Sequence, residues 1–280
     1  TLALPRTIGL AANQINLIIF ILFASKISEE NINAFNYAHM FIMLPVALIG
    51  MSVSIAIFPK ISSLFILKKF KEFHEYSEKT INLIIFLSIP AMIGILSLAQ
   101  PMTKLIFEHG QFDPNSTILV KNIVILFTPI IFAFSLTEIF SRIYYAAMDT
   151  KTPVVATVIS VIINVLICSF AVGKFGYQSI AVAGSIAALS ELSFLIYRLK
   201  KKGIIMNYQH ILADSMRVLI VSFGMYLIIQ LIDNIIVKKY LVNEFLSLFV
   251  LILVGIISYF ALFRICFKQK YSSIIHFLKA

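Results

Sequence analysis

Charged residues and cysteines are both scarce in this sequence. Only 13% of its 280 residues are Asp, Glu, Lys or Arg, and 60% are hydrophobic, against about 25% and about 45–50% in soluble domains. This composition excludes an ordinary soluble domain. The two cysteines, Cys168 and Cys266, lie far apart in or beside apolar runs. We therefore expect no disulfide and no metal site, and both residues are interpreted as small hydrophobes.

Clustered catalytic groups are also lacking. A membrane-embedded transferase or protease needs grouped carboxylates and histidines, or a nucleophile beside a base. The nearest approach is Glu138 with Arg142, which is a poor acid–base couple. The net charge of +10 could suggest a nucleic-acid partner, but the basic residues sit in short connections between apolar blocks. We expect no enzyme, no nucleic-acid partner and no organic cofactor.

The abundant feature is a series of apolar blocks of about twenty residues, the length of a helix that crosses about 30 Å of hydrocarbon. The predicted fold is an all-α polytopic membrane helix bundle with about eight transmembrane helices. They are expected at about 8–27, 34–58, 80–106, 117–147, 153–173, 178–197, 214–236 and 245–265.

The connections between these blocks alternate in charge. Seventeen of the 23 lysines and arginines fall on one side of the predicted topology, and such an excess marks the cytoplasmic side. The sequence therefore predicts a multi-pass protein of the cytoplasmic membrane with both termini in the cytosol. Between the second and third blocks, about 64–79, Leu67, Phe70 and Phe73 recur on one face. This pattern predicts an amphipathic helix on the cytoplasmic leaflet.

The fourth block carries a polar stripe. Glu138, Arg142, Tyr145 and Asp149 follow i, i+4, i+7, i+11 spacing, which places them on one helix face. One interpretation is an interfacial salt bridge between Glu138 and Arg142. The other is a cytoplasm-facing vestibule in which Arg142 meets an anionic headgroup, since a guanidinium binds such groups in bidentate fashion.

Other polar side chains interrupt the apolar blocks. Asn36 and His39 are one turn apart in the second block, and Asn164 lies in the fifth. Glu191 lies a few residues before the end of the sixth block, and we interpret it as solvated or paired at the interface. Pro45, Pro90 and Pro129 fall within three successive blocks, where proline kinks helices and broken helices can line a substrate path.

Several segments together resemble the MurJ (MviN) family of lipid II flippases in the MOP exporter superfamily. They are LPRTIG at 4–9, NAFNYA at 33–38, FPKIS at 58–62, LIFEHGQF at 105–112 and SRIYYAAMDTKTP at 141–153. The resemblance extends over nearly the whole chain, but only over the second part of the family's fourteen-helix plan. It implies that the first six helices are missing here. Residues 1–200 would form the second six-helix lobe, and 201–280 two additional helices with a possible groove for a lipid tail.

The resemblance implies a function and a set of site residues. The family flips a lipid-linked, undecaprenyl-bearing peptidoglycan precursor across the membrane by alternating access, driven by membrane potential or an ion gradient. Our candidates for the wall of a substrate cavity in this chain are Asn36, His39 and Arg142, with Glu138 holding Arg142 in place. The resemblance implies Asn164 as the remnant of a sodium site. The implied partners are membrane lipids, the undecaprenyl-linked precursor and the missing N-terminal lobe.

The sequence departs from the family pattern at three positions. Met40 stands where the family usually has a cavity arginine. Phe20 and Cys168 stand where some members have an acidic and a second polar residue of the sodium site. Two alternative functions remain open: a drug or oligosaccharide exporter of the same superfamily, and a transport-inactive scaffold for cell-wall synthesis.

Overall fold

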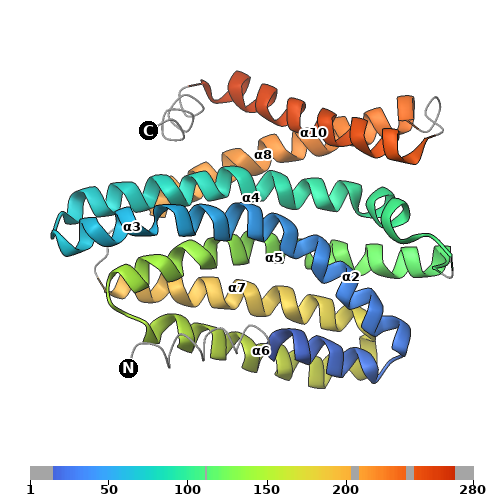
Figure 1. Cartoon of the computed structure of the whole chain (residues 1–280), viewed down its shortest axis with the longest axis horizontal. Helices are drawn as coiled ribbons and strands as arrows, with labels where there is room; N and C mark the ends of the chain where they lie inside the picture. Colours follow the sequence, from blue (N-terminus) through green and yellow to red (C-terminus); the bar gives the residue numbers. More distant parts are fainter. Residues whose placement is uncertain (1–14, 111, 203–207, 238–242, 269–280) are drawn as a thin grey trace.

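The computed structural model is a bundle of antiparallel helices (Figure 1). It describes residues 15–110, 112–202, 208–237 and 243–268, and within these ranges there is no β-strand. The helical segments in chain order are Ile15–Ser25, α2 Glu29–Pro45, η1 Val46–Met51, α3 Ser52–Ile66, α4 Phe70–Phe107, α5 Pro114–Ala146, α6 Lys151–Phe175, α7 Tyr177–Lys201, α8 Tyr208–Ile232, η2 Asp233–Val237 and α10 Glu244–Cys266.

Seven helical units in these ranges are long and apolar enough to cross a bilayer. One of them joins α2, η1 and α3 into a single unit, Glu29–Ile66. The prediction of an all-α polytopic membrane bundle is confirmed, and seven of its eight predicted spans are found. The remaining span, 8–27, lies partly outside the described residues, and its described part is the apolar helix Ile15–Ser25.

Local sequence signals explain where several helices begin and end. Ser28 precedes α2, and its hydroxyl accepts a hydrogen bond from the backbone N–H of Asn31 at 3.3 Å. Asp113 precedes α5 and accepts from the N–H of Ser116 at 2.8 Å. Both are N-caps, which satisfy helix N–H groups that would otherwise lack a partner. Met148 adopts a left-handed backbone with φ of 57° just after α5 ends.

Helix α5 lies at the centre of the bundle. It packs against α2, α3, α4 and α7, while α6 packs mainly on α7. Helices α8 and α10 lie on the other side of α4 from α5 (Figure 1). The central place of α5 agrees with its sequence, since its apolar residues extend around the helix instead of forming one stripe.

The predicted surface helix at 64–79 is not a separate element. Helix α3 continues to Ile66, a turn follows, and α4 then runs unbroken from Phe70 to Phe107. The phenyl ring of Phe73 is fully buried and packs on Phe65, with ring centroids 5.4 Å apart. Residues 70–79 therefore extend a membrane helix, because Phe73, Ser77 and Thr80 find buried places in the bundle instead of facing a leaflet.

Prolines inside the spans have different consequences. The carbonyl four residues before a proline loses its helical donor. For Pro129 that carbonyl belongs to Ile125, and Thr128 donates to it at 2.8 Å. For Pro90 it belongs to Phe86, and the Tyr259 hydroxyl of α10 donates to it at 2.6 Å. Pro90 thus frees the acceptor through which α10 is tied to α4.

After Pro45 the helix widens into the π-helical turn η1. π-Helical turns inside α-helices are frequent at functional sites. Gly50 lies in this turn, and a Cβ built on it would come within 2.6 Å of the Ser135 Cα on α5. The glycine therefore permits η1 to lie directly against the central helix.

We expect Gly50→Ala to lower the free energy of unfolding by about 1–3 kcal/mol, the usual cost of overpacking a core. The matched control is Gly94→Ala on α4, where an added Cβ meets nothing within 4 Å, and which should be neutral or stabilising by up to about 1 kcal/mol. Denaturant unfolding of both variants in mixed micelles measures the difference. Equal stabilities would contradict the close packing of η1 on α5.

Candidate functional site

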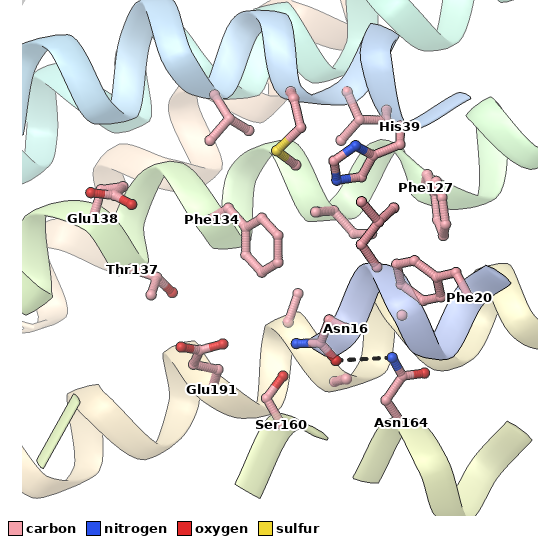
Figure 2. Close-up of a pocket in the computed structure, with 18 of the residues that line it drawn as sticks. Asn16, Phe20, His39, Phe127, Phe134, Thr137, Glu138, Ser160, Asn164 and Glu191 are labelled. Atoms are coloured by element: carbon pink, nitrogen blue, oxygen red, sulfur yellow. Dashed lines mark hydrogen bonds between the residues drawn. The ribbon is translucent and has the colours of Figure 1, made fainter. Parts of the chain in front are cut away.

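A cavity of about 630 Å³ lies inside the bundle between the helix Ile15–Ser25, α2, η1, α5, α6 and α7. Most of its wall is apolar. The polar side chains that reach it are those of Asn16, His39, Thr137, Glu138, Ser160, Asn164 and Glu191. Figure 2 shows Glu138, Thr137 and Glu191 towards one end of the view and the Asn16–Asn164 pair towards the other. The helices thus bring polar groups from five segments to one internal space.

Three of the five predicted site residues line this cavity. They are His39, Glu138 and Asn164. Asn36 is partly buried on α2 but is not part of the wall. Arg142 also lies outside the lining, one turn beyond Glu138. Sequence spacing correctly placed the residues on shared helices, but it could not say which of them reach the cavity.

Arg142 is held by groups of its own protein. Its Nη2 lies 3.7 Å from Glu138 Oε2, and the two side chains are 22% and 25% exposed. The guanidinium carbon also lies 5.9 Å from the ring centroids of both Phe58 and Tyr145. The predicted pairing of Glu138 with Arg142 is therefore present. Whether Arg142 meets a headgroup remains a prediction.

The predicted polar stripe is shorter than expected. Helix α5 ends at Ala146, so Asp149 lies beyond it and does not share its face with Glu138. The carboxylate of Asp149 accepts hydrogen bonds at 3.0 Å from the backbone N–H groups of Lys151 and Thr152, and it forms an ion pair with Lys202 after α7. Asp149 therefore joins the ends of α5, α6 and α7. The left-handed Met148 separates it from the stripe.

Asn164 does not have the surroundings that a sodium ion needs. Its Nδ2 donates to Asn16 Oδ1 at 3.0 Å, and the Cys168 thiol donates to its Oδ1 at 3.4 Å. A hard cation prefers several oxygen ligands, whereas the side-chain contacts of Asn164 are one amide oxygen and one thiol. Nearby, the Phe20 ring packs so closely that a Cβ on Gly184 would lie 2.7 Å from it. The residues present do not fit a sodium site centred on Asn164.

Glu191 is the cavity residue that sequence reasoning misplaced. It was expected at the interface, solvated or paired, but it is 3% exposed and lines the cavity. Gly184 and Ala187 precede it at i−7 and i−4 and line the same wall. This small-residue face was the signal for burial, since small residues let helices pack closely. Counting residues from the helix end gave the wrong depth because α7 continues to Lys201.

A second, apolar groove of about 350 Å³ lies between α4, α8, α10 and the end of α2. Pro90, Gly94 and Leu98 of α4 face Met225 and Ile229 of α8 across it. The groove and the cavity share one stretch of chain. Leu44 and Pro45 line the groove, whereas the neighbouring Met43 and Val46 line the cavity.

Comparison with known proteins is consistent with this architecture. The family model described as lipid II flippase MurJ matches residues 1–251. The chain belongs to the MurJ family. A probable lipid II flippase MurJ of Bdellovibrio bacteriovorus is 26% identical over 260 residues, which cover 92% of this chain and 50% of that relative. The chain spans about half the length of the curated relatives that it matches.

Solved structures show the same fold. A lipid II flippase MurJ in an inward closed conformation matches with a TM-score of 0.80 and 26% identity, over 93% of this chain and 52% of the other. An outward-facing multidrug resistance MATE transporter of the MOP superfamily matches with a TM-score of 0.59 and 17% identity, over 93% and 61%. The latter likeness concerns the fold alone.

Asp149 gives this MurJ-family chain a testable acid sensitivity. Burial alone would raise the pKa of Asp149, but hydrogen bonds from Lys202 and Thr152 lower it below its usual range. A carboxyl group whose folded-state pKa is depressed stabilises the fold above its unfolded pKa of about 3.9, and loses that contribution as the pH falls through the folded value. We therefore expect Asp149→Asn to destabilise the protein by about 1 kcal/mol at neutral pH, because the neutral amide keeps an acceptor oxygen but loses the ion pair with Lys202.

The difference between wild type and Asp149→Asn should shrink below about pH 4, which denaturant unfolding across pH measures. The control is Glu72→Gln, because Glu72 forms an ion pair with Lys69 in which both side chains are more than half exposed. Such pairs contribute little. A stability difference for Asp149→Asn that did not change with pH would contradict the assigned role.

Proposed function

We propose that this chain is the C-terminal half of a flippase for a lipid-linked peptidoglycan precursor. Its first 200 residues would form the second six-helix lobe, and α8 and α10 would be additional helices that hold the undecaprenyl tail. Membership of the MurJ family supports this proposal, as does the apolar groove between α4, α8 and α10. The groove is the structural observation that carries it, because a polyprenyl chain needs an apolar surface of this kind.

The internal cavity would serve the polar headgroup of the lipid during the transport cycle. His39 and Glu138 reach it from α2 and α5, and Asn36 and Arg142, one turn away from them on the same helices, are further candidates for the headgroup path. At Pro45 the same helix borders both the cavity and the groove. A movement of η1 would therefore change the groove for the lipid tail and the cavity for the headgroup at the same time. Alternating access needs a second lobe to move against, so we propose an N-terminal lobe as partner.

The proposal includes orientation and driving force. The turn between α3 and α4 and the turn between α5 and α6 lie at the same end of the bundle (Figure 1). Both carry basic residues, among them Lys68, Lys69 and Lys151. We place this end, and both termini, in the cytosol of a bacterium, with the helices in its inner membrane. We propose membrane potential as a driving force, because the surroundings of Asn164 do not suit sodium.

Two other functions have specific support. A transport-inactive scaffold is favoured by Met40, which is 63% exposed where the family usually has a cavity arginine. An exporter of drugs or oligosaccharides is favoured by the fold shared with the MATE transporter. The lower identity of that match and the apolar groove between α4, α8 and α10 favour the lipid substrate.

The first test is lipid flipping in vesicles that contain only these 280 residues. We expect no flipping, because one lobe has no second lobe to move against. Coexpression with the N-terminal lobe of a relative should restore growth to cells depleted of their lipid II flippase. Robust flipping by the chain alone would overturn the half-transporter proposal. Restoration only with Met40→Arg would favour the scaffold.

The second test concerns the groove. An added Cβ at Gly94 meets nothing within 4 Å, so Gly94→Leu should fill the groove without disturbing α4. We expect it to reduce cross-linking of a photoreactive undecaprenyl lipid to α8 and α10 several-fold. Gly173→Leu on α6 is the control, since Gly173 also has open space around it but lies outside the groove. Equal labelling of both variants would remove the groove from the proposal.

A further inference from the structure

Glu191 is the buried carboxyl group that the proposed lipid path does not use. It is 3% exposed, and its Oε2 has no hydrogen-bond partner among the described residues. Thr137 Oγ1 and Ser160 Oγ, which line the same cavity, are also buried and make no hydrogen bond of normal geometry among the described residues, although the Ser160 side chain lies close enough to the Glu191 carboxyl group to interact with it. Three oxygen atoms from α5, α6 and α7 thus reach one space unsatisfied (Figure 2).

The charged groups around Glu191 offer it no counter-ion. On α5, Arg142 lies outside the cavity lining and is already paired with Glu138, and α2 contributes His39 to the wall. The helix Ile15–Ser25 contributes the neutral Asn16. The remaining titratable side chains of α6 and α7 are Lys151, Cys168, Lys174, Tyr177, Tyr197, Arg198, Lys200 and Lys201. None of these lines the cavity.

An ionised carboxylate in such a place would be costly. Burial of an unpaired charge costs several kcal/mol, and a buried acid avoids that cost by keeping its proton. Within the membrane a buried ionisable group of this kind marks an ion or proton path. Glu138 differs in this respect, because Arg142 can balance its negative charge. The two acids of the cavity are therefore expected to differ in protonation.

The contact with Thr157 also favours a protonated Glu191. Thr157 Oγ1 lies 2.8 Å from Glu191 Oε1 and 3.1 Å from the carbonyl oxygen of Pro153. A hydroxyl has only one proton to donate. If Thr157 donates to the Pro153 carbonyl, the hydrogen bond to Glu191 needs a proton from the carboxyl group. Both contacts are satisfied together when Glu191 is protonated.

We propose that Glu191 is a proton-binding site of this lobe, protonated in the present conformation and deprotonated when the cavity opens to water. The proton moves between the carboxyl oxygen and water, and no other bond changes. Its coupling to transport rests on the proposed function, whereas the binding of the proton does not. A proton that enters from one side and leaves on the other would be driven by membrane potential.

The direct test is infrared spectroscopy of the purified chain in lipid vesicles, which detects the C=O stretch of a protonated carboxylic acid. At neutral pH we expect this band in wild type and in Glu138→Gln, and its loss in Glu191→Gln. Raising the pH should remove the band from wild type. The band does not depend on lipid flipping. A negative flipping assay would therefore count against the proposed function but not against the binding of a proton by Glu191.

Three outcomes would overturn the proposal: no band in wild type, a band that survives Glu191→Gln, or a band removed at fixed pH by sodium chloride but not by choline chloride. The last result would identify a sodium site. If circular dichroism shows that Glu191→Gln does not fold, the infrared spectrum of Glu191→Asp tests the assignment of the band instead. The proposal expects a band at a changed frequency in that variant, and an unchanged band would assign it to another acid.

Discussion

The constraint on which the structure depends is that lipid cannot hydrogen-bond a polar group. A chain with 13% charged residues spread over membrane-length helices must bring its intramembrane polar side chains to one another or to an internal space. Asn16 and Asn164 meet directly. Glu138 meets Arg142. Glu191, Thr137 and Ser160 each keep a buried side-chain oxygen atom that makes no hydrogen bond of normal geometry among the described residues. The cavity lies where the helices bring these groups together.

The same constraint explains how prolines are accommodated inside membrane helices. Pro90 leaves a carbonyl without its donor, and the Tyr259 hydroxyl supplies one from another helix. Pro129 leaves a second carbonyl, which Thr128 satisfies locally. At Pro45 the chain instead widens into η1, which lies against α5 because Gly50 has no side chain. Each of these prolines is thus accommodated by a nearby group, and Pro45 lies between the polar cavity and the apolar groove.

Much of this fold could be predicted from the sequence because its signals are strong in a membrane protein. Twenty-residue apolar blocks located the spans, and i, i+4 spacing placed Glu138 beside Arg142. Tertiary packing decided what periodicity could not. Residues 70–79 look amphipathic in isolation, but Phe73 is buried in the bundle. Asp149 has the residue spacing of the helical stripe that starts at Glu138, but α5 ends at Ala146, so Asp149 does not share that helix face. Glu191 lay deeper than its distance from the basic helix end suggested.

The measurement that tests the central claim most directly is the reactivity of single cysteines towards a water-soluble thiol reagent, in a background in which Cys168 and Cys266 are serine. Thr137 lines the cavity, whereas Ile220 of α8 is 62% exposed on the outside of the bundle. If polar groups gather around a hydrated internal space, Thr137→Cys reacts in membranes and Ile220→Cys does not, because thiolates do not form in hydrocarbon. An unreactive Thr137→Cys beside a reactive Ile220→Cys would contradict the account.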